Sequence, residues 1–270
     1  MPLAVCATPI GNLDDVTLRV LAELREADLV LAEDTRHTRK LLDRHAIDAR
    51  LLSYHEHNEA ARVAELLPRL AAGERIALVS DAGLPGVSDP GARIVRAALA
   101  TGVPVTVLPG PSAVETALVA SGLVGERYAF LGFLPRRRVE LEGVWAELAA
   151  SPWPAVAFES PARLPATLSS LAAAAPSREA AVCRELTKRF EEVVRGPVEE
   201  LALRFAEAPR GEITVVIGPA TARPVEDGVD AVAVAAVAEL VEAGTPRKIA
   251  AEVVSRLTDM SRNDLYRRTL

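Results

Sequence analysis

Short apolar runs alternate with helical patterns along most of this chain, and no other feature of the sequence constrains the fold as strongly. The strand-like runs of the first half lie near 3–7, 28–33, 50–54, 75–80 and 103–108. Helical patterns, with apolar residues three and four positions apart, lie near 16–26, 36–44, 58–72 and 91–100. Strands and helices that alternate in this way form a parallel sheet with helices on both faces. The first half therefore predicts an α/β domain, with Gly73 and Gly102 ending two of its helices.

A second series of the same kind follows. Its strand-like runs lie near 127–134, 154–159, 180–186 and 212–218. Its helical patterns lie near 138–150, 161–174 and 197–207. The pair Ser160-Pro161 is typical of an N-cap followed by proline in the first turn, so we expect a helix to begin there.

The character of the sequence changes after Pro219. A linker-like stretch over 220–229 leads to three short helical patterns near 230–242, 246–257 and 261–268, and Ser261 can cap the last of them. This unit resembles a helix-turn-helix, although any small group of three helices gives the same pattern. We expect three parts: an N-terminal α/β domain over 1–122, a C-terminal α/β domain over 123–220 and a helical extension over 228–270.

Composition and charge exclude several classes of protein. The 270 residues include 31 Lys and Arg against 37 Asp and Glu, so the net charge of −6 excludes a nucleic-acid-coating protein that is basic throughout. Five Phe, three Tyr and two Trp are too few for a module that stacks successive bases on aromatic rings. No signal peptide and no apolar stretch of membrane-spanning length is visible, and Cys6 and Cys183 fit buried free thiols, so we expect a cytoplasmic protein.

Ligands of open α/β sheets bind beyond the carboxyl ends of the strands, so the loops there are the candidate sites. Four loops are rich in turn-forming residues: ATPIGNLDD (7–15), SDAGLPGVSDPG (80–91), LPGPSAVETAL (108–118) and GEITVVIGP (211–219). Ser112 and Glu115 match a capping box, and the free N–H groups of such a helix start either bind an anionic group or simply begin an ordinary helix. Asp81 can accept hydrogen bonds from a ligand or from the N–H groups of its own loop.

The motifs of two common nucleotide-binding classes are absent. Neither G-x-G-x-x-G nor G-x-x-x-x-G-K-[ST] occurs, which disfavours a nicotinamide-dependent oxidoreductase and a P-loop NTPase. His55 and His57 would face the same way on a strand, but no cysteine and no HExxH spacing supports them. We therefore predict no metal site.

Two basic segments follow strand-like runs. EDTRHTRKLL (33–42) places Arg36, Arg39 and Lys40 on one helix, and RELTKRFEE (184–192) contains Lys188 and Arg189. Each segment alone is typical of a solvated charged face. Because both lie at carboxyl ends of strands in an acidic protein, together they favour a polyanionic substrate.

Seven segments in this order resemble the small-subunit ribosomal RNA methyltransferase I group of the tetrapyrrole methylase superfamily. They are ATPIGNLDD, AEDTRHTRKLL, SYHEHNE, SDAGLPGVSDPG, LPGPSA, FLGFLPR and GEITVVIGP. The resemblance covers about residues 1–219, and the helical tail resembles the helix-turn-helix extension of that group. It implies two α/β domains with S-adenosylmethionine in the cleft between them, and a homodimer. The implied reaction is 2′-O-methylation of a cytidine in the decoding region of 16S rRNA within the small ribosomal subunit.

The resemblance also implies roles for individual residues. The implied cofactor contacts are Pro9, Gly11, Asp81, Gly83, Pro85, Val87, Ser112, Ala113, Phe158, Glu159, Leu186, Glu212, Ile213 and Thr214. The implied RNA contacts are Thr35, Arg36, Arg39, Lys40, Tyr54, Asn58, Glu59 and Arg189. A free 2′-hydroxyl needs a base or a charge-stabilising neighbour, and the candidates are Glu33, Asp34, His55 and Lys188.

Two other functions remain open from the sequence. One is a methylase acting on a precorrin-type tetrapyrrole, against which the basic segment 33–42 and the helical tail count. The other is a non-catalytic RNA-binding assembly factor that uses the pocket only as a sensor.

Overall fold

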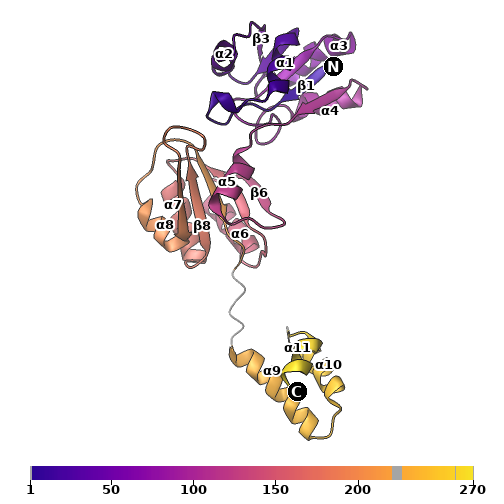
Figure 1. Ribbon diagram of the computed structural model, residues 1–270, viewed down its shortest axis with the longest axis vertical. Coiled ribbons are helices and arrows are strands. Elements are labelled where there is room, and N and C mark those ends of the chain that lie inside the picture. Colours follow the sequence, from indigo (N-terminus) through magenta and orange to yellow (C-terminus); the bar gives the residue numbers. More distant parts are fainter. Residues whose placement is uncertain (1, 221–226, 259, 270) are drawn as a thin grey trace. The chain divides into compact units, whose positions relative to one another are not determined.

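The structure, a computed structural model, describes residues 2–220, 227–258 and 260–269 (Figure 1). The chain divides into two units, Met1–Pro219 and Ala220–Leu270. Most of the linker expected over 220–229 lies outside the described residues. Within the described ranges, every helix is too short or too polar to cross a membrane.

The first unit contains two five-stranded sheets, and the first of them is parallel throughout. Its strands are β1 (Leu3–Cys6), β2 (Leu29–Ala32), β3 (Leu51–Ser53), β4 (Ile76–Val79) and β5 (Val105–Leu108). The strand order is β3-β2-β4-β1-β5, and all four pairs are parallel. The predicted parallel sheet is therefore confirmed.

Helices cover both faces of this sheet. They are α1 (Leu18–Glu26), α2 (Thr35–Arg44), α3 (Glu59–Ala71) and α4 (Ala92–Ala100), with a short 3-10 turn, η1 (Leu13–Asp15), before α1. Successive side chains of a strand point to opposite faces, so Ala4 and Cys6 pack with α1 and α2 while Leu3 and Val5 pack with α3 and α4. The predicted two-sided covering is confirmed. Gly73 and Gly102 follow their helices with φ of 89° and 75°, the left-handed conformation expected of them.

The second sheet is mixed, which the alternating pattern did not predict. Its strands are β6 (Ala129–Phe133), β7 (Ala155–Glu159), β8 (Glu179–Arg184), β9 (Glu192–Pro197) and β10 (Ile213–Ile217). In the order β6-β7-β10-β8-β9, only β6 and β7 pair in parallel. Strand β9 was not predicted, because this edge strand, EVVRGP, has no fully buried residue and therefore no continuous apolar run.

Four helices pack on the second sheet. They are α5 (Ala113–Ser121), α6 (Arg138–Leu148), α7 (Leu164–Ala174) and α8 (Val198–Arg204). Buried residues of α6, α7 and α8 share one core with one face of the sheet. The opposite face packs against α5, with Ile10 from the loop after β1 in the same cluster. The cavity of the first unit forms at this face, between the second sheet, α5 and the loop after β1.

Two predicted helix starts are wrong in detail. Ser112 is the N-cap of α5, but its hydroxyl hydrogen-bonds the Glu115 carboxylate instead of a backbone N–H, so the capping box does not form. The helix expected from Pro161 begins at Leu164, because 161–163 form a turn in which the carbonyl of Ser160 accepts the N–H groups of Arg163 and Leu164.

The described residues of the second unit form three helices, as predicted. They are α9 (Asp227–Glu242), α10 (Arg247–Leu257) and α11 (Arg262–Arg268). Val237, Ala250, Ala251 and Leu265 form the centre of its separate core. The Ser261 hydroxyl accepts the N–H of Asp264 at 3.1 Å, which confirms the predicted cap.

Candidate functional site

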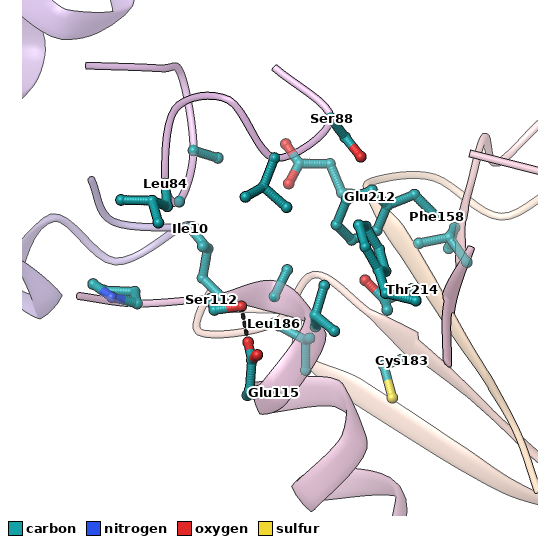
Figure 2. Close-up of a pocket in the computed structure, with 18 of the residues that line it drawn as sticks. Ile10, Leu84, Ser88, Ser112, Glu115, Phe158, Cys183, Leu186, Glu212 and Thr214 are labelled. Atoms are coloured by element: carbon teal, nitrogen blue, oxygen red, sulfur yellow. Dashed lines mark hydrogen bonds between the residues drawn. The ribbon is translucent and has the colours of Figure 1, made fainter. Parts of the chain in front are cut away.

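A cavity of about 680 Å³ lies beyond the carboxyl end of the first sheet, within the first unit. The loop after β4 and the segment 109–115 line one side, and β6, β7 and the start of β10 line the other (Figure 2). Ile10, Cys183 and Leu186 complete the wall, which is largely apolar. The volume lies within the range usual for a small-molecule site.

Most of the implied cofactor contacts line this cavity. They are Gly83, Val87, Ser112, Ala113, Phe158, Glu159, Leu186, Glu212, Ile213 and Thr214. The structure thus brings together segments that are more than a hundred residues apart in sequence. Pro9, Gly11, Asp81 and Pro85 are not among the lining residues.

Two of these four have other contacts in the structure. Asp81 accepts the N–H of Asp34 at 3.1 Å, so its carboxylate joins the loop after β4 to the start of α2. Gly11 lies against the loop after β8, where an added Cβ would come within 2.5 Å of Lys188 Cγ and 2.8 Å of the Leu186 carbonyl oxygen. The next N–H, that of Asn12, donates to the Thr187 hydroxyl at 3.0 Å. Gly11 therefore permits a close contact between the two sides of the site.

Several lining residues were not singled out in the sequence. Phe130 and Phe133 pack edge-on against Phe158, with ring centroids 5.1 Å and 5.4 Å away. The segment FLGFLPR contains the first two and was a signal that they belong to the site. Tyr128 and Asp89 also line the cavity, and Asp89 belongs to the same loop, 80–91, as the predicted cofactor contact Asp81.

Three carboxylates of the cavity wall have firm partners. Glu115 accepts hydrogen bonds from Ser112 and Tyr128, which lower its pKa. Glu159 has a fully buried side chain, and it accepts from Thr167 at 2.6 Å and from the N–H of Ser160 at 2.8 Å. Glu212 pairs with the Lys188 ammonium at 3.0 Å.

Asp89, the fourth carboxylate, has a different environment. Burial raises its pKa to about 7, and the nearby charge of Glu33 adds to the rise. A hydrogen bond with Ser80 opposes this shift, while Asp81 contributes to it. Asp89 is therefore partly protonated near neutral pH.

The four candidate bases of the sequence are not among the residues that line the cavity: Glu33, Asp34 and His55 belong to the loops after β2 and β3, and Lys188 to the loop after β8. Burial, and then the charge of Asp81, raises the pKa of Glu33. Hydrogen bonds from Arg36 lower the pKa of Asp34 to about 2. Burial acts to lower the pKa of Lys188, but hydrogen bonds to Glu185 and Glu212 outweigh it, so Lys188 stays protonated.

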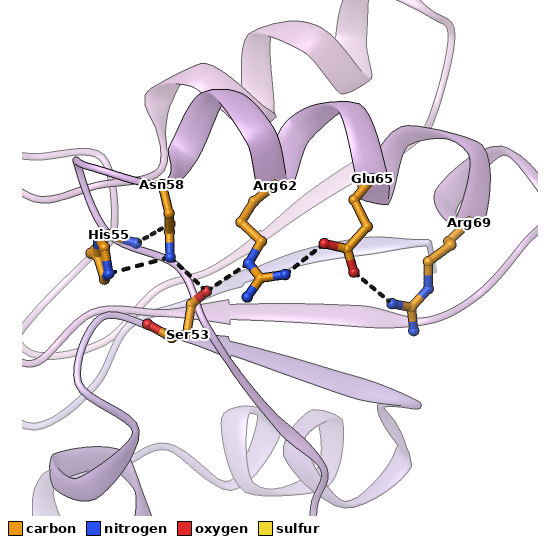
Figure 3. A network of polar contacts seen from close by, with 6 residues as sticks. All are labelled: Ser53, His55, Asn58, Arg62, Glu65 and Arg69. Atoms are coloured by element: carbon orange, nitrogen blue, oxygen red, sulfur yellow. Dashed lines mark hydrogen bonds and ion pairs between the residues drawn. The ribbon is translucent and has the colours of Figure 1, made fainter.

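His55 belongs to a polar network after β3 (Figure 3). Its N–H donates to Asn58 Oδ1 at 2.8 Å, and Asn58 Nδ2 donates to the Ser53 carbonyl at 3.1 Å. Arg62 donates to the same carbonyl at 3.2 Å. His55 and His57 lie in a turn and not on a strand, and no cluster of His, Cys, Asp and Glu in the described ranges could hold a metal.

The implied RNA contacts separate into buried and exposed groups. Tyr54 is buried, and its hydroxyl donates to Glu59 at 3.0 Å. Glu59 also accepts the N–H of Gly91 at 2.9 Å, so both residues brace the loop that carries Asp89. The exposed group is Arg36 and Lys40 on α2 and Arg189 in the loop after β8, whereas Thr35, Arg39 and Asn58 are half-buried.

A family model described as Tetrapyrrole (Corrin/Porphyrin) Methylases matches residues 2–202. A ribosomal RNA small subunit methyltransferase I of Micromonospora olivasterospora is 43% identical over 267 residues, which are 98% of this chain and 85% of that protein. The protein of the same description from Thermotoga maritima is 45% identical over 80% of this chain and 97% of its own length.

Solved structures show the same fold at lower identity. The methyltransferase CobJ superposes with a TM-score of 0.63 at 21% identity, over 83% of this chain and 96% of that chain. A uroporphyrin-III C-methyltransferase from Thermus thermophilus, complexed with S-adenyl homocysteine, gives 0.56 at 20% identity, over 79% and 96%. Together with the family model and the sequence relatives, these findings place the chain: it belongs to the tetrapyrrole methylase family, in the group of ribosomal RNA small subunit methyltransferases I.

Proposed function

We propose that this protein transfers a methyl group from S-adenosylmethionine to the ribose 2′-hydroxyl of a cytidine in 16S rRNA of the small ribosomal subunit. The observation that carries the proposal is the extent of the sequence similarity. The chain is 43% identical to the Micromonospora relative over 98% of its length and 45% identical to the Thermotoga relative over 80%, whereas it is 21% identical to CobJ over 83%. This difference favours rRNA over a tetrapyrrole as the substrate.

The charge of the cavity wall fits S-adenosylmethionine. Its described lining contains four carboxylates and no Lys, Arg or His. A wall of this kind suits a ligand with a positive sulfonium and ammonium, and it disfavours the pyrophosphate of a nicotinamide dinucleotide.

The shape of the cavity wall fits the same ligand. Gly83 has a φ of 77°, and a Cβ at this position would come 3.8 Å from the Pro111 carbonyl oxygen and 3.9 Å from the Ile10 side chain, both of which line the cavity. The bare backbone here leaves room for a ligand, and Phe130, Phe133 and Phe158 offer aromatic surface for a purine ring.

Residues from both sides of the cavity would bind the cofactor. Gly83 and Val87 on one side, with Phe158, Leu186 and the backbone of 212–214 on the other, would hold the cofactor. Bound S-adenosylmethionine supplies an activated methyl group, so the protein contributes mainly position and a place for the hydroxyl proton. Ser112, Ala113 and Glu159 complete the proposed contact set.

The exposed cations provide the proposed RNA surface. Arg36, Lys40 and Arg189 would contact phosphates, in a cytoplasmic homodimer whose protomers each contain domains 1–122, 123–220 and 228–270. Support for the domain division comes from the separate cores of the two sheets and of the helical unit.

Methyl transfer with labelled cofactor tests the proposal. The protein is incubated with tritiated S-adenosylmethionine and small ribosomal subunits from cells that lack the homologous enzyme, and the RNA is then hydrolysed in alkali. Label in an alkali-resistant dinucleotide is the expected result, because a methylated 2′-oxygen cannot assist strand cleavage. Label in mononucleotides would indicate a base methylase. Label only in an added precorrin-type substrate would favour the tetrapyrrole function, and cofactor binding without transfer would favour the sensor.

A further inference from the structure

The four carboxylates of the cavity wall differ in how completely they are partnered. Hydrogen-bond donors hold Glu115 and Glu159, and the Lys188 ammonium pairs with Glu212. Asp89 has two negative neighbours, Glu33 and Asp81, and its nearby Ser80 hydroxyl also donates to the carbonyls of Ala82 and Gly83. A carboxylate that is short of donors at the wall of a ligand cavity is suited to take up a proton.

The backbone fixes Asp89 in this place. The residue before it, Ser88, has a φ of 63°, and Gly91 two residues later has a φ of 140°. A Cβ on Gly91 would come within 3.0 Å of Leu78 Cδ2 and 3.3 Å of the Gly86 nitrogen. Glu59 accepts the Gly91 N–H at 2.9 Å and also pairs with Arg93 at 3.7 Å. Strained backbone held by neighbouring contacts is typical of functional sites.

We propose that Asp89 accepts the proton of the ribose 2′-hydroxyl during methyl transfer, an inference that rests on the proposed function and extends it. The ribose oxygen forms a bond to the methyl carbon as the carbon–sulfur bond of the donor breaks and its electron pair stays on sulfur. The hydroxyl proton passes to a carboxylate oxygen of Asp89 and then to solvent. The products are a 2′-O-methyl ribose, neutral S-adenosylhomocysteine and protonated Asp89.

The candidate bases from the sequence are less suited to this step. Asp34 has a pKa of about 2 and is a weak base, and Lys188 stays protonated in its ion pairs. Glu33 and His55 do not line the cavity. Glu33 instead contributes to the raised pKa of Asp89, and His55 acts on the pKa of Glu33. The pKa of about 7 at Asp89 matches a proton acceptor that works near neutral pH.

The test compares Asp89→Asn and Asp89→Glu with a control, Asp48→Asn. Asp48 is an exposed aspartate just before β3, at the opposite end of the first sheet. Calorimetry measures S-adenosylmethionine binding, ¹³C NMR of labelled aspartate measures carboxyl titration, and single-turnover transfer to small subunits is followed against pH.

We expect one aspartate of the wild-type protein to titrate near pH 7, and this signal to vanish in Asp89→Asn alone. Cofactor affinity should stay within about threefold in Asp89→Asn, which also shows that the variant folds, while transfer slows by about 10²–10⁴-fold and loses its pH dependence. Wild-type transfer should rise with pH and level off above about 7, because the carboxylate must be unprotonated. Asp89→Glu should recover part of the rate, and Asp48→Asn should behave as wild type.

Three results would overturn the assignment. Asp89→Asn that transfers methyl groups at the wild-type rate, or that loses cofactor binding, shows that Asp89 is not the proton acceptor. Absence of a titration near pH 7 removes its physical basis. If the wild-type protein itself transfers no methyl group to subunits, the proposed function fails too, which distinguishes this case from a failure of Asp89 alone.

Discussion

Two regions of the cavity wall place carboxylates in opposite surroundings. At the end of β7, Glu159 is fully buried and accepts hydrogen bonds from Thr167 and Ser160, with Arg163 3.3 Å away. In the loop after β4, Asp89 is half-buried beside two other acids. A buried carboxylate with hydrogen-bond donors stabilises the fold. When donors are too few, burial disfavours the charged form of the carboxyl group and raises its pKa. The second sheet therefore supplies a carboxylate fixed by its partners, and the loops of the first sheet carry the proposed proton acceptor.

The largest expected effect is on the second-sheet side. Replacing Glu159 by Ala leaves Arg163 without its carboxylate and the hydroxyl of Thr167 without its acceptor. Breaking a buried charged network of this kind costs about 3–5 kcal/mol of unfolding free energy, measured by urea denaturation. Glu142→Ala is the matched control, since its ion pair with Arg138 is exposed and should contribute less than about 1 kcal/mol. Equal effects of the two substitutions would contradict the structural role of Glu159.

In contrast to Glu159→Ala, Asp89→Asn should raise the unfolding free energy above neutral pH. The pKa of Asp89 is higher in the folded protein, about 7, than its ordinary value of 3.8, so the folded state keeps a proton that the unfolded state loses. Stability associated with Asp89 is therefore present at low pH and is lost as pH rises from about 4 to 7. At pH 8 we expect Asp89→Asn to be more stable than wild type by about 1–2 kcal/mol, discounted for partial solvent exposure, and equal to it near pH 4. Urea denaturation at both pH values measures this, and a less stable variant at pH 8 would show that Asp89 is well partnered.

The contact between the two regions gives a smaller effect. In Gly11→Ala the new methyl group would overlap Lys188 Cγ and the Leu186 carbonyl oxygen, so the loops after β1 and β8 must move apart. Leu186 lines the cavity, and we expect S-adenosylmethionine to bind about 1–2 kcal/mol more weakly by calorimetry, with a loss of about 1 kcal/mol of unfolding free energy from the overlap itself. Gly143→Ala, on the exposed surface of α6 with nothing within 4 Å of its added Cβ, is the control. If Gly11→Ala binds S-adenosylmethionine with unchanged affinity, the contact between these two loops does not affect cofactor binding.

The same two regions differ in how far the sequence could predict them. The first sheet was predicted in full because β1, β2 and β4 are buried on both faces and appear as continuous apolar runs. β9 was missed because an edge strand with a charged and partly exposed sequence lacks that signal. The loop 80–91 was recognised from its turn residues, yet its sequence does not show the difference by which Asp89 lines the cavity and Asp81 does not. This difference depends on the φ angles of Ser88 and Gly91 and on the N–H of Asp34, a tertiary contact 47 residues away.

The smallest expected effect concerns the charge that surrounds Asp89. After burial, Glu33 is the next cause of the raised pKa of Asp89. Removing this charge in Glu33→Gln should lower the Asp89 pKa by up to about 1 unit, so both its ¹³C titration and the midpoint of the pH–rate curve should move to lower pH. Glu56→Gln, an exposed acid in the neighbouring turn, should leave both unchanged. Loss of the pH dependence of transfer in Glu33→Gln, with the Asp89 titration unmoved, would mean that Glu33 itself is the titrating group, because two coupled acids can exchange the role of proton holder.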